Sequence, residues 1–189
     1  MSAFDGAQIR SALEHQNRII RPFSPDDSIA DLTALLHRAY KPLLDMGLRY
    51  LATHQSEDVT RARIAKRRCF VAVSGDRVVG TVSYGFPDPW PGVPWFSQPG
   101  VASVGQFAVE PELQRNGIGG SLLSFVEDLA RQDGVEELSL NTAEPAHHLI
   151  AYYEKRGYRV VDTTDATMPN YRSVIMSKRL GPGSRGKQG

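Results

Sequence analysis

The sequence predicts an α/β (α+β) domain, and three observations support that fold class. β-rich apolar runs alternate with segments of helical spacing, in the order strand, two helices, three strands, helix, strand, helix, two strands. A glycine-rich turn joins one of the strands to the helix that follows it. The 189 residues are enough for one domain with a full core.

In the N-terminal half, the first helix follows from Ser24 to Asp27, whose side chains can cap free N–H groups. Apolar residues at helical spacing come next, namely Ile29, Leu32, Leu35, Leu36 and Ala39. Ser74 to Arg77 separates two β-rich runs, which predicts a hairpin. The expected elements are a strand at 18–23, the helix just described, a second helix at 57–67, and strands at 69–73 and 78–84.

In the C-terminal half, Gly157 is a good C-terminal cap for the helix before it. The expected elements are strands at 103–109, 137–141, 158–161 and 173–177, and helices at 121–132 and 146–156. The resulting domain spans residues 18–180. A polar N-terminal extension, 1–17, precedes it, and a glycine-rich tail, 181–189, should be disordered.

Residues 85–100 interrupt this periodicity with five prolines, which predict a long surface loop because proline stops strands. Loops of this length in a compact domain tend to be functional or mobile. Trp90, Trp95 and Phe96 lie among the prolines. These aromatic rings could stack on a ligand or pack the loop onto the domain, and the sequence leaves both readings open.

The composition narrows the function classes. A formal charge of +1 gives no reason to expect a nucleic acid or an anionic membrane as partner. No stretch reaches the roughly 20 apolar residues of a membrane span, and residues 1–17 lack the apolar run of a secretory signal. Cys69 is the only cysteine, which excludes an intrachain disulfide and a cysteine-based zinc cluster. We expect a cytoplasmic protein that uses no metal.

The glycine turn predicts a site for a pyrophosphate. Gly117, Gly119 and Gly120 allow backbone N–H groups to converge, and the helix that follows has free N–H groups and a favourable dipole. A Rossmann fingerprint would need a third glycine, where Leu122 and Leu123 stand instead. A Walker loop would need a lysine, which is absent from the turn. A plain strand-to-helix turn is the remaining alternative.

Two motifs resemble those of the GCN5-related N-acetyltransferase (GNAT) superfamily. The spacing Gln114-x-x-Gly117-x-Gly119 is similar to its Q/R-x-x-G-x-G/A signature. The stretch Leu149 to Tyr158 is similar to its later motif, A-x-x-x-Y-E-K-x-G-F/Y. The resemblance covers Arg18 to Leu180 and implies the GNAT fold, a mixed central sheet of about six or seven strands flanked by about four helices.

The resemblance implies an acyltransferase that moves the acetyl group of acetyl-CoA directly to a primary amine. The glycine turn would bind the pyrophosphate, and the strand before it would pair with the pantetheine arm and leave an N–H near the thioester oxygen. Tyr153, at the tyrosine of the second motif, would act as general acid to the CoA thiolate. The expected cofactor-binding residues are Phe107, Ala108, Val109, Gln114, Arg115, Asn116, Gly117, Ile118, Gly119, Gly120, Ser121, Asn141 and Tyr153.

The sequence does not identify a general base. Some family members place a glutamate on the strand before the glycine turn, and Ser103 occupies that position here. Glu110, just past the strand, is expected to be solvated, and Gln106 could hold a water but cannot titrate. Histidine titrates near neutral pH, so three histidines are further candidates, namely His54, His147 and His148. The chain also departs from the second motif, where Ala146 and Leu149 replace the family's Asn and Ala.

The acceptor is expected to be a small-molecule amine, held between the early helices, 26–67, and the proline loop, 85–100. Asp45 and Asp88 could attract its positive charge. A protein or peptide acceptor, a non-catalytic acyl-CoA sensor and another nucleotide-phosphate binder remain alternatives. The final strand could also pair across a homodimer, as in some members of the family.

Overall fold

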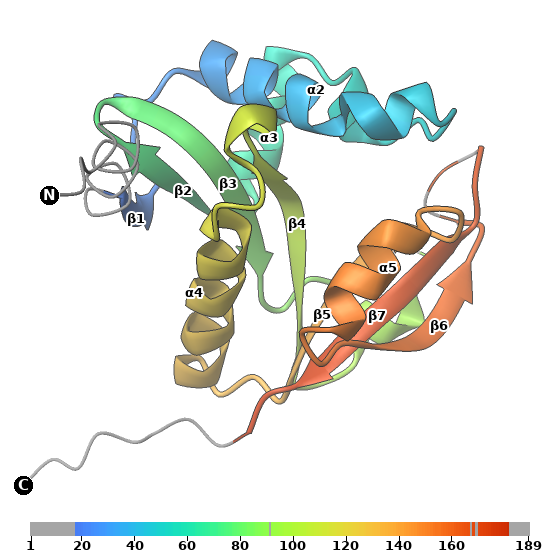
Figure 1. The fold of residues 1–189 in the computed structure, drawn as a ribbon. Helices are drawn as coiled ribbons and strands as arrows, with labels where there is room; N and C mark the ends of the chain where they lie inside the picture. The colour runs from blue at the N-terminus through green and yellow to red at the C-terminus, as the bar shows by residue number, and fades with distance from the viewer. Residues whose placement is uncertain (1–17, 91, 167, 169, 182–189) are drawn as a thin grey trace, which may run out of the picture.

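The computed structural model describes residues 18–90, 92–166, 168 and 170–181, which form a seven-stranded sheet with helices on both faces (Figure 1). The strand order is β1-β2-β3-β4-β5-β7-β6. Strands β4 and β5 are parallel, and all other neighbours are antiparallel. The strands are β1 (Arg18–Pro22), β2 (Arg68–Ser74), β3 (Arg77–Gly85), β4 (Val101–Val109), β5 (Glu137–Ala143), β6 (Arg159–Thr164) and β7 (Ser173–Arg179).

The helices and strands follow one another in the predicted order, so the predicted element order and the α/β (α+β) fold class are confirmed. The helices are α2 (Ile29–Asp45), α3 (Glu57–Ala65), α4 (Ile118–Gln132) and α5 (His147–Glu154), with short 3₁₀ helices η1 (Leu51–Thr53), η2 (Pro94–Ser97) and η3 (Pro111–Leu113). The predicted extension, 1–17, and residues 182–189 of the predicted tail lie outside the described residues. No described helix is both long and apolar enough to cross a membrane.

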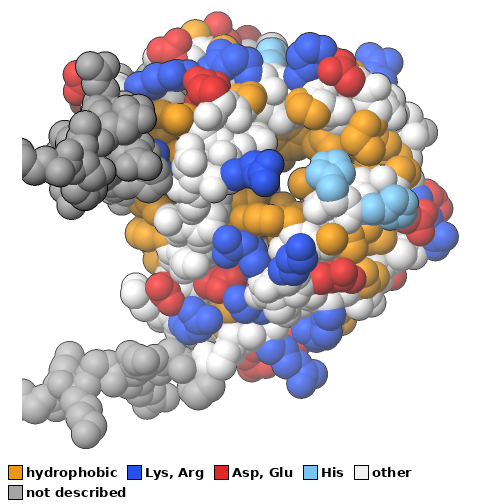
Figure 2. Space-filling model, viewed as in Figure 1, with side chains coloured by type: hydrophobic (Ala, Val, Ile, Leu, Met, Phe, Trp, Pro, Cys, Tyr) orange, Lys and Arg blue, Asp and Glu red, His pale blue; other side chains and the backbone are white. Residues whose placement is uncertain are grey.

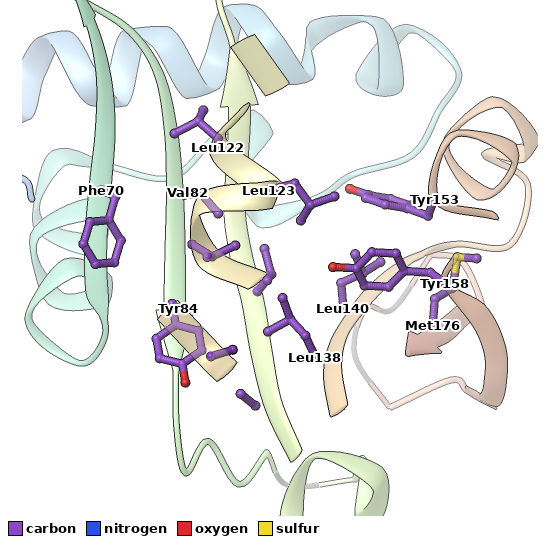
Figure 3. Close-up of a cluster of buried hydrophobic side chains, with 14 of the residues drawn as sticks. Phe70, Val82, Tyr84, Leu122, Leu123, Leu138, Leu140, Tyr153, Tyr158 and Met176 are labelled. Carbon is purple, nitrogen blue, oxygen red and sulfur yellow. The ribbon is translucent and has the colours of Figure 1, made fainter. Parts of the chain in front are cut away.

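The core is divided between the two faces of the sheet by the alternation of side chains along each strand. In β2, Phe70 and Ala72 pack in the cluster that contains α4, whereas Cys69 packs in the cluster that contains α2. The larger cluster continues across the sheet. Figure 3 shows this cluster extending from Phe70 of β2 and Val82 and Tyr84 of β3, past Leu122 and Leu123 of α4, to Leu138, Leu140, Tyr153, Tyr158 and Met176.

Strands β4 and β5 separate shortly after they meet. Their pairing covers only Val101 to Ser103 of β4 and Glu137 to Ser139 of β5. Beyond this point β4 pairs with β3 alone among the described strands, so one edge of residues 104–109 is open. The register between β3 and β4 also shifts here, and Gln106 has a φ of 44°, which marks a bulge.

Most predicted bounds differ from the observed ones by one to three residues, and two differences from the sequence prediction affect the site and its surroundings. Helix α4 begins at Ile118, three residues before the predicted Ser121, because Gly119 and Gly120 adopt helical conformation and belong to the first turn. The predicted surface loop at 85–100 is partly internal. It contains η2, and Val93 and Phe96 are buried against Ile175 of β7. Strand β3 ends before the first proline, as expected, but the apolar side chains of the loop are partly buried against the domain.

Candidate functional site

A cavity of about 460 Å³ lies where β4 and β5 separate. Figure 2 shows this face of the molecule hollowed between the parts that carry α4 and α5, with Lys and Arg side chains at the border of the hollow. The cavity is lined by ten of the thirteen residues that the sequence predicted to bind a cofactor, namely Phe107, Ala108, Val109, Gln114, Arg115, Gly117, Gly119, Gly120, Asn141 and Tyr153.

Three predicted residues do not line the cavity. The buried side chain of Ile118 packs in the core, and the carbonyl of Asn116 accepts a hydrogen bond from Arg18 at 3.2 Å. The N–H of Ser121 donates to the carbonyl of Gly117 at 2.9 Å, so this group is already used within the helix. The side chain of Gln114 binds the carbonyl of Val109 at 3.2 Å, which ties the start of the turn to the end of β4.

The glycine turn has the geometry of an anion site. Gly117 is the N-cap of α4 and has a φ of +81°, a conformation that favours glycine. Arg115 also has a positive φ, 65°. Because the hydrogen bond from Ser121 to Gly117 is the first of the helix, the N–H groups before Ser121 lie at its free N-terminal end.

Arg156, which the sequence analysis did not single out, adds a cation to this end of α4. A Cβ placed on Gly120 would lie 2.3 Å from the Nη2 atom of Arg156, so the guanidinium rests directly on the glycine. Its Cζ atom also lies 4.9 Å from the ring centre of Tyr152, a cation–π contact. A Cβ on Gly119 would meet Phe107 at 3.3 Å and the hydroxyl of Tyr152 at 3.4 Å. The turn thus combines backbone donors and a guanidinium, and the lack of side chains at Gly119 and Gly120 keeps room beside them.

Tyr153 closes the cavity from α5. Its ring extends toward Leu123 of α4 (Figure 3). The side chain is buried, yet its hydroxyl forms no hydrogen bond with the described residues and is open to a group in the cavity. Burial raises the pKa of Tyr153 well above its ordinary value of 10, so the hydroxyl keeps its proton at neutral pH.

A second cavity, of about 430 Å³, adjoins the first. It lies between the early helices, the start of the proline loop and the bulged part of β4. Five side chains line both cavities, namely Tyr40, Tyr50, Phe107, Asn141 and Tyr153. The charged residues of the second cavity are Arg63, Lys66, Arg67 and Asp88. A group in the first cavity can therefore meet a group in the second at Tyr153.

Ser103 proves to be one end of a polar cluster. Its hydroxyl donates to the carboxylate of Asp88, and Arg67 donates to both residues. Asp88 comes from the proline loop, so the loop places a carboxylate beside the strand position where some family members carry a glutamate. Gly105 provides the room, since a Cβ there would lie 2.6 Å from Nη1 of Arg67.

None of the histidines considered as bases lines either cavity. His147 and His148 are exposed at the start of α5, and His54 is exposed and contacts Thr53. The expectation that Glu110 is solvated is wrong. Glu110 is only 1% exposed because Arg38 and Arg77 cover its carboxylate. Gln106 is also buried, and its Oε1 atom has no partner among the described residues.

The aromatic residues of the proline loop divide between the two roles left open by the sequence. Phe96 is buried, and Trp95 donates to the hydroxyl of Ser139 at 2.9 Å, so both hold the loop on the domain. Trp90 stacks on Phe96 and lines the second cavity. Of the two candidate carboxylates, Asp88 lines this cavity, whereas Asp45 pairs with Lys41 on the surface.

Sequence reasoning expected the early helices, 26–67, beside the acceptor, but it did not single out Tyr40 and Tyr50, which line both cavities. The hydroxyl of Tyr40 donates to the carbonyl of Phe107 at 3.2 Å, which supports the bulge of β4. Tyr50 contacts Tyr40 and Tyr171 through its ring, and its hydroxyl accepts from the N–H of Ala143 at 2.6 Å. Nothing in the local sequence around these tyrosines distinguishes them from ordinary core residues.

Comparisons with known proteins agree with this geometry. The sequence model described as the Acetyltransferase (GNAT) family matches residues 30–158. The chain is 33% identical to the S-(2-succino)cysteine N-acetyltransferase of Bacillus subtilis over 132 residues, which cover 67% of this chain and 76% of that protein. It is 24% identical to the S-alkylcysteine N-acetyltransferase of the same organism over 140 residues, 71% of this chain and 75% of that protein.

The fold matches solved structures as well. A GNAT family acetyltransferase from Elizabethkingia anophelis, solved with acetyl-CoA bound, superposes with a TM-score of 0.62 at 17% sequence identity. The superposition covers 87% of this chain and 99% of that one.

Proposed function

Because the chain belongs to the GNAT acetyltransferase family and is an acetyl-CoA-dependent acyltransferase, we propose that it acetylates the primary amine of a small molecule by direct transfer, with Tyr153 as general acid. The observation that carries this proposal is the meeting of the two cavities at Tyr153. One cavity has the features of a pyrophosphate site, and the other is of a size that fits a small molecule.

The residues of the first cavity fit acetyl-CoA. Its pyrophosphate would lie at the N-terminus of α4, against the backbone from Arg115 to Gly120 and the guanidinium of Arg156. The pantetheine arm would follow the open edge of β4 between residues 104 and 109. When bound there, acetyl-CoA supplies the thioester carbonyl that an amine can attack.

Tyr153 is suited to protonate a leaving thiolate. A general acid must hold its proton until the thiolate departs, and burial keeps the pKa of Tyr153 well above 10. Tyr153 lines both cavities, and its hydroxyl forms no hydrogen bond with another described residue. These properties favour a role as acid over a role as base.

The acceptor amine must lose a proton before it attacks. For a lysine-like amine, deprotonation at neutral pH costs roughly 4–5 kcal/mol. The carboxylate of Asp88 is already engaged by Arg67 and by the hydroxyl of Ser103, so we do not assign it as the base. The Oε1 atom of Gln106, which has no partner among the described residues, can instead accept a hydrogen bond from the ammonium group or from a water that passes the amine proton on to solvent. We therefore place amine binding near Gln106 and assign no titrating base.

The relatives support a small acceptor, since both named enzymes act on S-substituted cysteines. We accordingly propose the α-amine of an amino acid of this kind as the site of acetylation. S-(2-succino)cysteine and S-methylcysteine are suitable first substrates for an assay of CoA release.

The variant Tyr153→Phe tests the mechanism. It should lower kcat by about 10²- to 10⁴-fold, the usual contribution of a positioned acid, because the ring stays but the proton donor is lost. The Kd for acetyl-CoA, measured by calorimetry, should stay close to that of the wild type. Tyr158→Phe is the matched control, because Tyr158 is also buried but donates to Glu127 and lines neither cavity. Unchanged turnover in Tyr153→Phe would remove the proposed role.

A further inference from the structure

Arg63 is a half-buried cation that the rest of the described protein does not neutralise. It lies in the last turn of α3 and lines the second cavity. None of the ion pairs formed by the described residues includes it. Burial lowers the pKa of its guanidinium, the direction expected for a positive charge partly withdrawn from water. Such a charge is costly unless a ligand or a partner balances it.

The side chain of Arg63 is nevertheless held in place. Its Nη1 atom donates to Oε1 of Gln55 at 2.6 Å, and Gln55 is only 1% exposed. The other end of that amide, Nε2, donates to Oγ1 of Thr60 at 2.7 Å. Thr33 donates to the same oxygen at 2.8 Å. The network fixes the orientation of the amide, so its oxygen faces the guanidinium and orients it without removing its charge.

The other charges of the cavity do not compensate for Arg63. Arg67 is the ion-pair partner of Asp88, the only carboxylate among the described lining residues. Lys66 is exposed at the rim. Three cations and one carboxylate thus line the cavity, which leaves two positive charges unbalanced. An arginine in the last turn of a helix can stabilise the helix dipole while its side chain stays in water. Arg63 is instead bound to the buried amide of Gln55, so this role alone does not account for its position.

We infer, on the basis of the proposed N-acetyltransferase function, that the acceptor carries a carboxylate and that Arg63 binds it. The guanidinium has donors left on Nε and Nη2 after its bond to Gln55, and these can face a carboxylate in the cavity. An amino acid would then lie with its carboxylate toward α3 and its amine toward Gln106 and Tyr153. Arg63 is in this view the residue that distinguishes amino acids from simple amines.

The test compares S-methylcysteine with S-methylcysteine amide, which share the side chain and the α-amine and differ in the charge of the carboxyl group; each variant is compared with the wild type on the same compound. Hydrogen bonds to charged groups are worth about 1.5–3 kcal/mol, so Arg63→Gln should raise KM for S-methylcysteine roughly 10- to 100-fold. The KM for the amide and the Kd for acetyl-CoA should not change. Arg63→Lys should restore part of the loss. Arg61→Gln is the matched control, because Arg61 lies exposed on the same helix and does not line the cavity.

Calorimetric titration of both compounds into the CoA-bound protein provides a readout that does not depend on turnover. Weaker binding of S-methylcysteine to Arg63→Gln, with binding of the amide unchanged, supports the carboxylate site even if no amine is acetylated. In that case only the proposed transferase reaction fails. Equal effects of Arg63→Gln on the two compounds, or no effect on either, would overturn the inference.

Discussion

Gly120 sits under the guanidinium of Arg156, and this contact gives a specific prediction. In Gly120→Ala the new methyl group would lie 2.3 Å from the Nη2 atom, closer than two such atoms can approach, so Arg156 must move away from the N-terminus of α4. Helix propensity favours alanine by up to about 1 kcal/mol. We therefore expect the melting temperature to stay the same or rise, while the Kd for CoA increases about 10-fold, as for one lost charge-assisted contact.

A double-mutant cycle shows whether the effect of Gly120→Ala passes through Arg156. Arg156→Ala alone should weaken CoA binding by a similar factor, and Gly120→Ala should add little in that background. Additive losses would mean that the methyl group obstructs CoA directly and that Arg156 has a separate role.

Single residues of the site differ in how well the sequence reveals them. Tyr153 and the glycines were found because they stand in two motifs at a defined spacing. Arg156 also lies inside the second motif, but its contact with Gly120 could not be predicted because the two residues are distant in the sequence. The environment of Glu110 was predicted wrongly for the same reason. The arginines that bury it come from α2 and β3, and no local pattern indicates that pairing.

At the scale of elements, Arg38 fastens helix α2 to the end of β4. It donates to both carboxylate oxygens of Glu110, whereas Arg77 makes one contact at 3.1 Å and is shared with Glu112. Arg38→Ala would leave a buried carboxylate with a weaker partner and should cost about 2–3 kcal/mol of unfolding free energy. Arg77→Ala should cost less than about 1 kcal/mol. Urea unfolding of both variants measures the difference, and equal losses would contradict it.

Most elements were predictable because their periodicity is local, but two features that create the site were not. The separation of β4 from β5 depends on pairing between strands far apart in the chain, and the bulge at Gln106 puts a residue other than glycine at positive φ. The early start of α4 also escaped prediction, since glycines usually indicate a turn. Sequence periodicity thus predicted which elements form, and tertiary pairing determined where the strands part.

At the scale of the whole molecule, the tyrosines predict alkaline instability. All seven have a raised pKa, chiefly through burial, and that of Tyr40 rises to about 12. Above pH 10 the unfolded chain loses tyrosine protons that the folded protein retains. Stability is therefore fully present below pH 10 and falls as the pH rises further, by about 1.36 kcal/mol per pH unit for each such tyrosine.

Urea unfolding at a series of pH values, combined with tyrosinate absorbance, checks this prediction. The free energy of unfolding should decline from pH 10 upward, and tyrosinate should appear together with unfolding. Ionisation of most tyrosines near pH 10 in a protein that stays folded would contradict it.

Because Tyr40, Tyr50, Phe107, Asn141 and Tyr153 line both cavities, a molecule in one cavity changes the surface offered to a molecule in the other. Thermodynamic linkage then requires reciprocity. Whatever factor the acceptor contributes to the affinity for acetyl-CoA, acetyl-CoA contributes to the affinity for the acceptor. A measured affinity for either substrate therefore depends on whether the other cavity is occupied, and that occupancy must be stated with the value.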